Sequence, residues 1–214
     1  MCLFGAEGKF GFSILDHSTG EFKTGERDLT KLRTLIQQFT PTEIIVPEFQ
    51  LNDFKSRIGN DYLFTVYNEW MFDEQSCYNR LTEHFKSKNL KGFGLEKLSL
   101  AISSSGVIID YLKKNCKANI NHISSISIIK EKGFMNLDGF TIRNLEIFNS
   151  LNSQNDNNSL IECLDYTITA IGGRLLKSWV RSPLTNKKQI EFRHNLIEEL
   201  FSNKNIVNDL KVSF

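Results

Sequence analysis

The sequence predicts an α/β domain built around a mixed sheet, followed by a mainly α-helical region. Over residues 1–118, short apolar or alternating runs typical of strands are interleaved with segments whose apolar residues recur at helical spacing. Beyond a change of pattern near residues 117–121, most signals are helical. We therefore expect two domains, residues 1–118 and 119–214, joined at Ala118–Asn121 by a short hinge rather than by a long tether.

Four segments in the first domain have strand character. Phe10–Asp16 is followed by a turn at Ser18–Gly20 and by a second extended segment at Glu21–Thr24. Glu43–Val46 is a nearly continuous apolar run bounded by prolines, which is typical of a strand buried on both faces. Leu63–Tyr67 indicates one further strand.

Three helices separate or follow these strands. Asp28 can cap the first helix, which Pro41 ends, and the second helix starts at Asp73. The apolar stripes are Leu29, Leu32, Leu35, Ile36 and Phe39 in the first helix, Cys77, Tyr78, Leu81 and Phe85 in the second, and Leu98, Ala101, Ile102, Ser105, Ile108, Ile109 and Leu112 in the third. Strands interleaved with helices in this way favour a layered α/β structure.

The second domain is expected to be helical after two extended pieces. The extended pieces are Ile123–Ile128 and Phe134–Leu137, and the helices are Asp138–Phe148, Thr169–Val180 and Asn186–Phe201. The last helix carries an apolar stripe that must be buried against something or remain exposed. Between the first two helices, Asn152–Asn158 is polar and rich in asparagine, which indicates a surface loop.

The composition and charge of the chain limit the classes of function that we expect. Lys and Arg total 26 against 25 Asp and Glu, a formal charge of +1, whereas a dedicated nucleic-acid binder usually has a basic excess. The four cysteines and four histidines are scattered without zinc-ligand spacing, so we expect reduced thiols and no metal site. No signal peptide or long apolar run is present, and we expect a cytoplasmic protein without membrane attachment.

The first of two recognisable motifs is Leu137–Glu146 (LDGFTIRNLE). Asp138 stands three residues before Thr141, so its carboxylate can cap the backbone N–H groups of a new helix. Arg143, followed by Asn144, would then form an i,i+3 pair with Glu146 on that helix.

The second motif is Asp165–Val180 (DYTITAIGGRLLKSWV). Thr167 or Thr169 can cap a helix whose first turn holds Gly172 and Gly173, where missing side chains permit close helix approach. One side of this helix carries Ile171, Leu175, Trp179 and Val180, and we expect Trp179 to anchor the core. The opposite side carries Arg174, Lys177 and Arg181. A solvated face explains these cations best, which leaves them as weak candidates for DNA or partner contacts.

Both motifs are similar to segments of the MutS DNA mismatch-repair family, LDxxTRRNLE and LDxTxTxMGxRxLxxWL. Asp16–Phe22 resembles the DxSTGEF turn of the family's connector domain, and Gly92–Glu96 resembles its GFGxE segment. The motifs occur in the family's order over essentially the whole chain. One departure is Ile142, where the common pattern has arginine, so a paired-arginine contact is not expected here.

The resemblance implies a ribonuclease-H-like connector domain at residues 1–118, followed at 119–214 by the opening part of the all-α core, or lever, domain. It implies a non-catalytic segment that couples mismatch recognition to a distant ATPase and offers a docking surface to a MutL-type partner. The full-length protein is expected to be a cytoplasmic, nucleoid-associated homodimer that binds mismatched duplex DNA, ATP and magnesium. The segment itself is expected to be monomeric or weakly self-associating. A MutS relative acting in recombination remains open.

Catalytic alternatives have little support in the residues. The nearest imitation of a phosphate-binding loop, Gly172–Ser178, has Leu176 where glycine is needed and lies inside a predicted helix, so we expect no cofactor here. Phe72-Asp73-Glu74 spells the Phe-x-Glu of the family's mismatch wedge, but Asp73 is better explained as a helix cap, and we expect the mismatch-binding domain to be absent.

The ribonuclease-H-like fold keeps a metal-dependent nuclease open as an alternative. Its ligands would be Asp16, expected to end the first strand, with Glu48 and Asp53. Asp16 before Ser18–Gly20 is better explained as a turn-forming residue that accepts nearby backbone N–H groups.

Overall fold

The computed structural model describes residues 1–115, 120–129, 133–135, 137–151, 159–203 and 207. The predicted loop Asn152–Asn158 and part of the predicted hinge, Ala118 and Asn119, lie outside these residues. The chain forms two compact units, Met1–Ile129 and Lys130–Phe214. This division falls eleven residues later than the boundary expected at residue 118.

Unit 1 is built on one six-stranded sheet with the order β5-β4-β1-β2-β3-β6. The strands are β1 (Cys2–Ala6), β2 (Lys9–Asp16), β3 (Glu21–Arg27), β4 (Ile44–Pro47), β5 (Phe64–Tyr67) and β6 (Ser127–Ile128). β2 runs antiparallel to β1 and β3, and the other neighbours are parallel, so the sheet is mixed as predicted. β1 has no counterpart among the strands predicted from the sequence. Asp16 therefore ends the second strand and not the first, which corrects the expectation.

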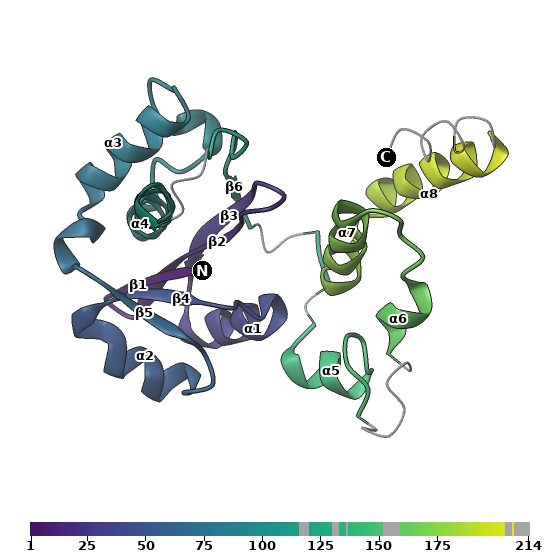
Figure 1. The fold of residues 1–214 in the computed structure, drawn as a ribbon, viewed down its shortest axis with the longest axis horizontal. Helices are drawn as coiled ribbons and strands as arrows, with labels where there is room; N and C mark the ends of the chain where they lie inside the picture. The colour runs from purple at the N-terminus through teal and green to yellow at the C-terminus, as the bar shows by residue number, and fades with distance from the viewer. Residues whose placement is uncertain (116–119, 130–132, 136, 152–158, 204–206, 208–214) are drawn as a thin grey trace. The chain divides into compact units, whose positions relative to one another are not determined.

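Helices cover both faces of the sheet, with α1 and α2 on one side and α3 and α4 on the other (Figure 1). Their bounds are α1 (Leu29–Phe39), α2 (Leu51–Ile58), α3 (Glu74–His84) and α4 (Ser99–Asn115), with 3-10 turns η1 (Glu48–Gln50), η2 (Glu69–Phe72) and η3 (Lys91–Phe93). The predicted caps are confirmed: Asp28 accepts from the Lys31 N–H at 2.9 Å and Asp73 from the Ser76 N–H at 2.8 Å. α2 was not predicted from the sequence.

The strands separate two apolar cores, because successive side chains point to opposite faces of a sheet. Leu3, Ile44 and Val46 pack on the side of α1 and α2. Cys2, which precedes Leu3, and Ile45, which lies between Ile44 and Val46, pack on the side of α3 and α4. A strand such as β4, which is buried on both faces, is therefore apolar throughout. This confirms the doubly buried strand that was predicted from the apolar run Glu43–Val46.

The first turns of α4 lie directly on β2 and β3. A Cβ on Gly11 would stand 2.2 Å from the carbonyl oxygen of Leu100, so β2 needs glycine there. Glu26 of β3 accepts the N–H of Leu100 at 3.0 Å, which satisfies an amide of the first turn of the helix. Deeper in the contact, the buried hydroxyls of Ser13 and Ser105 are 2.7 Å apart, so each polar group has a partner.

Residues 120–129 belong to unit 1 because they are anchored on it along their length. Ile120, Ile123 and Ile126 are buried in the core beside α3 and α4, and β6 pairs with β3. The Nε2 atom of His84 lies 2.8 Å from the carbonyl oxygen of Ile123. This anchoring is the physical reason why the units divide after Ile129 rather than near residue 118.

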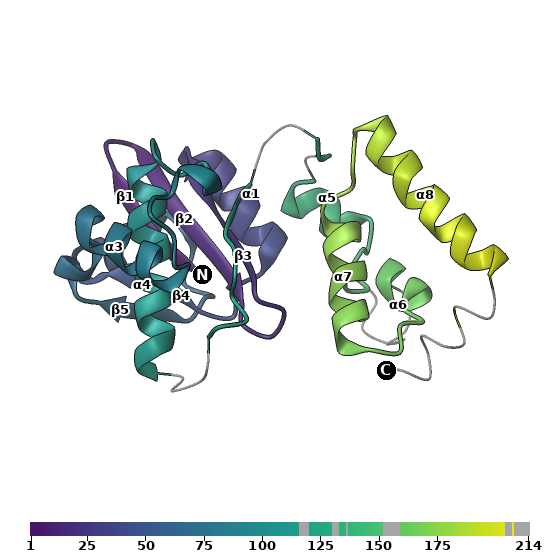
Figure 2. The same cartoon turned by 90° about the horizontal axis from the view of Figure 1, so that it is seen from above.

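Unit 2 is helical, with α5 (Gly139–Asn144), α6 (Leu160–Leu164), α7 (Ala170–Arg181) and α8 (Lys187–Ser202) (Figure 2). Phe134 forms an antiparallel bridge with Leu184. Among the described residues of this unit, the buried apolar side chains are Leu137, Ile147 and Ile161. Three buried apolar side chains are few for four helices, so most of their apolar surface remains accessible. In the described parts of both units, no helix is long and apolar enough to cross a membrane.

Candidate functional site

Asp16 builds the turn between β2 and β3. Its Oδ1 atom accepts the Ser18 N–H at 2.9 Å and the Ser18 hydroxyl at 2.5 Å, while its carbonyl oxygen accepts the Gly20 N–H at 2.9 Å. The turn-forming role predicted for Asp16 is confirmed. Of the other carboxylates considered for a nuclease, Asp53 forms an ion pair with Arg57 at 2.6 Å on α2. Within the described ranges, no group of three or more His, Cys, Asp or Glu side chains could hold a metal ion.

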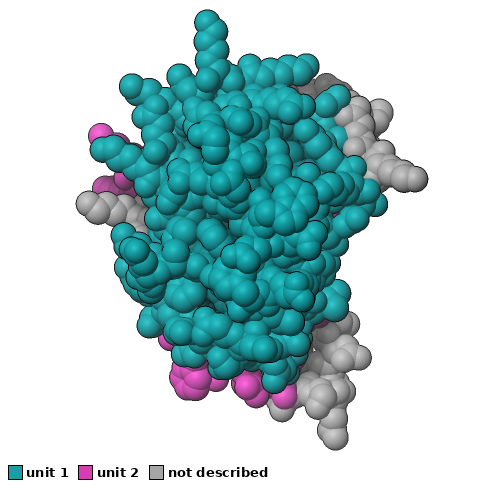
Figure 3. All heavy atoms as spheres, turned by 90° about the vertical axis from the view of Figure 1, so that its left-hand side faces the viewer, with its two compact units in different colours: residues 1–129 teal, residues 130–214 magenta. Residues whose placement is uncertain are grey.

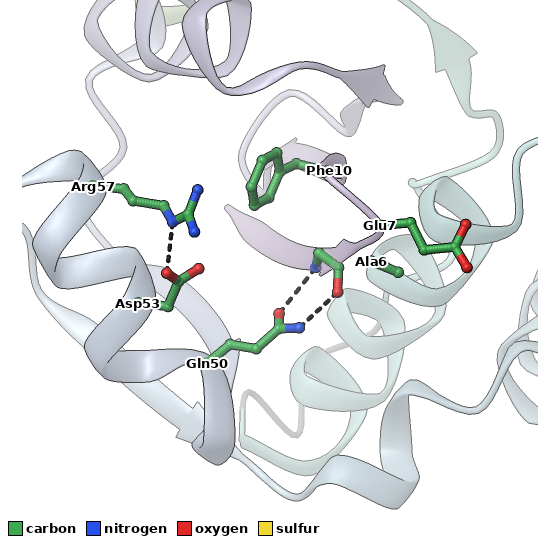
Figure 4. Close-up of a pocket in the computed structure, with 8 residues that line it drawn as sticks. Ala6, Glu7, Phe10, Gln50, Asp53 and Arg57 are labelled. Atoms are coloured by element: carbon green, nitrogen blue, oxygen red, sulfur yellow. Dashed lines mark hydrogen bonds and ion pairs between the residues drawn. The ribbon is translucent and has the colours of Figure 1, made fainter.

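A pocket of about 170 Å³ opens where β1 turns into β2, beside η1 and α2 (Figure 4). The amide side chain of Gln50 spans its floor, accepting the Gly5 N–H at 2.9 Å and donating to the Gly5 carbonyl at 2.6 Å. Asp53 and Arg57 form the opposite wall, with the guanidinium 6.0 Å from the Phe10 ring. Gln50 thus binds the backbone of β1, and Asp53 binds Arg57 within α2, so these polar side chains stabilise the elements that surround the pocket.

The two segments that resemble a mismatch wedge and a phosphate-binding loop, Phe72-Asp73-Glu74 and Gly172–Ser178, have structural roles. Phe72 is 2% exposed and stacks on Phe4 with ring centroids 5.1 Å apart, while Asp73 caps α3. Gly172–Ser178 lies within α7, where the backbone N–H groups bond along the helix instead of wrapping a phosphate.

In unit 2, Asp138 caps α5 as predicted, accepting the Thr141 N–H at 2.8 Å. Hydrogen bonds from Thr141 lower the pKa of this carboxyl. The expected helix through Phe148 is shorter, however, because α5 ends at Asn144. Glu146 has a left-handed backbone and accepts the Leu151 N–H, so the expected i,i+3 pairing on a common helix is wrong.

Side-chain hydrogen bonds fix the turn that leads into α7. Thr169, rather than Thr167, caps the helix by accepting the Gly172 N–H at 3.1 Å. Asp165 accepts the Thr167 hydroxyl at 2.5 Å, and this bond lowers its pKa. A Cβ on Gly173 would stand 3.1 Å from the Thr167 hydroxyl oxygen, so the glycines admit the preceding loop and not a neighbouring helix.

The three cations predicted on one side of α7 do not share one environment. Arg174 and Lys177 are exposed. Arg181 is half-buried, and its guanidinium lies 4.9 Å from the ring centre of Phe148. Burial also lowers the Arg181 pKa. Arg181 therefore packs within unit 2, and the solvated face consists of Arg174 and Lys177.

Trp179, the expected core anchor, is not among the fully buried residues of unit 2. Trp179 is half-buried, with the Arg193 guanidinium 4.0 Å from its ring centre. Ile171 is 66% exposed and Leu175 51%, on the same side of α7. The apolar stripe expected on α8 is also exposed to solvent, since Ile197 is 53% exposed. In the described part of the chain, Ile171, Leu175 and Ile197 are therefore largely exposed, and Arg193 covers only part of the apolar face of α7 at Trp179.

Two exposed aromatic side chains in the turns that follow β4 and β5 were not predicted from the sequence. Phe49 in η1 and Trp70 in η2 are both strongly exposed, and Gln50, the last residue of η1, lines the pocket. Periodicity could not find them, because each lies in a turn of three or four residues. A weak signal was present in the form of aromatic residues flanked by acids.

In the described residues, the motif side chains of the two units thus form turns, helix caps and packing contacts. The family model for MutS domain II matches residues 1–124, and the model for MutS domain III matches residues 140–214. The chain belongs to the MutS family.

Curated relatives agree. The chain is 36% identical to the DNA mismatch repair protein MutS of Flavobacterium johnsoniae over 206 residues, which is 96% of this chain and 24% of that protein. It is 40% identical to the protein of the same name from Flavobacterium psychrophilum, over 87% of this chain and 21% of the relative. The chain thus spans less than a quarter of the length of these relatives.

Proposed function

We propose that this chain is the joint of a MutS-type mismatch repair protein, composed of the connector domain and the first part of the lever domain. The observation that carries the proposal is the pair of family matches, in chain order, over an α/β unit and a helical unit. The mixed sheet supports a ribonuclease-H-like connector, since β3-β2-β1-β4-β5 combines three antiparallel strands with two parallel ones in the order of that fold. The names of the relatives favour mismatch repair over recombination.

In this proposal, the full-length protein binds mismatched DNA and ATP, works as a homodimer, and uses this segment without catalysis. Two features support a mechanical role. Unit 1 has a continuous core on each face of its sheet, so it can move as one body. Unit 2 exposes apolar stripes on α7 and α8, which suits helices that pack against later parts of a longer chain. The MutL-type partner would dock on unit 1.

The coupling role is tested in the full-length protein. Thr169→Ala removes the side-chain cap of α7 and should loosen the start of the helix without touching unit 1. We expect mismatch binding and basal ATPase activity to be retained, and the stimulation of ATPase by mismatched DNA to fall. Thr42→Ala, at an exposed position of unit 1, is the matched control. Unchanged stimulation in a Thr169 variant whose α7 exchanges amide protons faster would contradict the proposal.

Binding by the chain alone gives a second test. With a net charge of +1, it should bind duplex DNA weakly and without preference for a mismatch. It should not bind ATP, and a calorimetric signal abolished by Lys177→Ala would overturn this expectation.

A further inference from the structure

The chain leaves unit 1 at Ile129, and both polar backbone groups of this residue are bound to β3. The Ile129 N–H donates to the carbonyl oxygen of Thr24 at 2.9 Å. The Ile129 carbonyl oxygen accepts from the guanidinium of Arg27, the last residue of β3. These two bonds form the exit anchor. Residues 1–129, drawn in teal in Figure 3, are one compact unit, so the exit anchor fixes the end of that unit.

The exit anchor depends on Arg27 because the strand before Ile129 is short. β6 consists of Ser127 and Ile128 and lies at the edge of the sheet beside β3. A pairing of two residues contributes few hydrogen bonds, so it opens at a low free energy. The Arg27 guanidinium is itself held in place, because it donates to the Glu26 carbonyl at 2.7 Å and lies 5.7 Å from the centre of the Phe12 ring. A charged donor that is fixed in this way strengthens the attachment of Ile129.

The first described residues of unit 2, 133–135, are bound to the turn between α7 and α8. Phe134 forms an antiparallel bridge with Leu184 in that turn, which separates the end of α7 from the start of α8. Two backbone hydrogen bonds flank the bridge, from the Thr185 N–H to the Gly133 carbonyl at 2.9 Å and from the Met135 N–H to the Pro183 carbonyl at 2.7 Å. These contacts form the entry ladder, through which the chain joins unit 2 at the α7–α8 turn before it reaches α5.

Little chain separates the exit anchor from the entry ladder. Gly133 begins the ladder with a φ of 108°, which residues with side chains rarely adopt. Among the described residues, no heavy atom beyond its chain neighbours lies within 4 Å of a Cβ placed there, so the backbone alone requires glycine. Only residues 130–132 stand between Ile129 and Gly133 in the sequence, and an extended chain advances at most about 3.6 Å per residue. The covalent link between the two anchored ends is therefore short.

We propose that Arg27 is a positioning residue that keeps this link short, so that a displacement of unit 1 acts on the α7–α8 turn of unit 2. The inference rests on the proposed function, in which the chain is a mechanical joint, and it names the part of each unit that the joint connects. A short link transmits a displacement only while both of its ends are fixed. Without Arg27, Ile129 and β6 would detach more often, and each detached residue would lengthen the link by about 3.3 Å.

The test measures amide exchange at residues 127–129 of this chain, and the stimulation of ATPase activity by mismatched DNA in the full-length protein. Arg27→Ala should speed the exchange about tenfold or more, as expected when a hydrogen bond from a charged donor is lost, and should lower the stimulation. Arg27→Lys keeps one charged donor and should restore part of both. Arg33→Ala is the matched control, because Arg33 also donates to a backbone carbonyl within unit 1, that of Arg57. It should leave both quantities unchanged.

A second variant lengthens the link without removing either anchor. Insertion of Gly-Ser-Gly-Ser between Glu131 and Lys132 adds about 14 Å of extended chain. The stimulation of ATPase activity should fall as it does in Arg27→Ala, whereas amide exchange at residues 127–129 should stay at its natural rate. Because the inserted chain keeps Arg27, a loss of stimulation in it cannot come from damage to the fold of unit 1.

The outcomes separate the inference from the proposed function. Faster exchange in Arg27→Ala with undiminished stimulation would overturn the inference, and so would full stimulation in the inserted protein. Exchange that Arg27→Ala leaves unchanged would show that this side chain does not hold Ile129, which would also overturn it. Each of these results leaves the proposed function standing. A natural full-length protein whose ATPase activity does not respond to mismatched DNA would overturn the proposed function itself.

Discussion

A Cβ atom placed on Gly106 of α4 would stand 2.4 Å from the Cβ of Cys77 on α3. Two Cβ atoms do not approach so closely. Helices α3 and α4 therefore touch at Gly106, where α4 has no side chain. The contact is buried, and the Cys77 thiol lies 3.3 Å from the carbonyl oxygen of Ser103 on α4. Burial raises the pKa of this thiol to about 12, which keeps it protonated at neutral pH. Cys77 therefore acts as a small packing residue between the helices.

Gly106→Ala should destabilise unit 1, because the added methyl group must displace backbone or the Cys77 side chain. Overpacking of this kind costs about 1–3 kcal/mol of unfolding free energy. Urea unfolding followed by circular dichroism measures the loss. Gly92→Ala is the control, since nothing lies within 4 Å of a Cβ at that exposed position. Equal stability of the two variants would show that the helices separate easily at this contact.

Acid should weaken unit 2 through the carboxylates that form its turns. Hydrogen bonds from Thr141, Ser159 and Thr167 lower the pKa values of Asp138, Glu162 and Asp165, respectively. A carboxyl whose pKa is lower in the folded state stabilises it fully above the unfolded pKa, about 4, and loses that effect as the pH falls through the folded value. The helix content of unit 2, measured by circular dichroism, should therefore decrease when the pH is lowered below about 4.

The matched control for this acid prediction is a triple variant, Asp138→Asn, Glu162→Gln and Asp165→Asn. The amides keep an acceptor oxygen but cannot be protonated in this range. The variant should show a flatter dependence of helix content on pH, measured by circular dichroism or by amide shifts of α5 and α6. A variant as acid-sensitive as the natural chain would place the sensitivity elsewhere.

His84 should make the anchoring of residues 120–129 depend on pH. Burial is the largest cause that lowers the pKa of its imidazole, and Lys113 lowers it further, while the bond to the Ile123 carbonyl and Glu83 oppose this. The folded state therefore prefers the neutral ring. The stabilisation is complete above the unfolded pKa, about 6.5, and is lost as the pH falls through the folded value.

The measurement is amide exchange of Ile123–Ile128 in the natural chain and in His84→Gln. Glutamine can donate to the Ile123 carbonyl without titrating, so the variant should remove the loss of protection below about pH 6.5. Loss of protection that is the same in both chains would show that the isoleucines and β6, not the imidazole, respond to pH.

Much of unit 1 was predictable because its strands and stripes carry strong local signals, and its caps follow from side-chain chemistry. β1 and α2 were missed for a physical reason. Cys2–Ala6 is short and does not alternate, and α2 buries only Phe54 fully, so neither has a clear period. The short helix α6 was also not predicted, although the capping box of Ser159 and Glu162 marks its start in the sequence.

Exposure in unit 2 was harder to predict. The spacing of Ile171, Leu175 and Trp179 correctly shows which side of α7 is apolar, but periodicity does not say what covers that side. The exposure of Phe49 and Trp70 was missed because each lies in a short turn after a strand, where no periodic pattern marks it.

The open faces of α7 and α8 lead to the last prediction, on local stability. Amide protection reflects the free energy of opening, which is low where few apolar side chains are buried. On α8, Ile197 is 53% exposed and Phe201 is 82% exposed, whereas Ile44 and Val46 on β4 are completely buried. Amides of α7 and α8 should therefore exchange much faster than those of β2 and β4.

Hydrogen exchange at several chain concentrations completes the test. Open apolar faces favour weak self-association, which would slow exchange in α7 and α8 as the concentration rises. Phe201→Lys, which places a charge on the most exposed of these side chains, should abolish the concentration dependence and leave β4 unaffected. Helices α7 and α8 that are as protected as β4 at the lowest concentration would mean that unit 2 closes its own core in solution, and the picture of open apolar faces would be wrong.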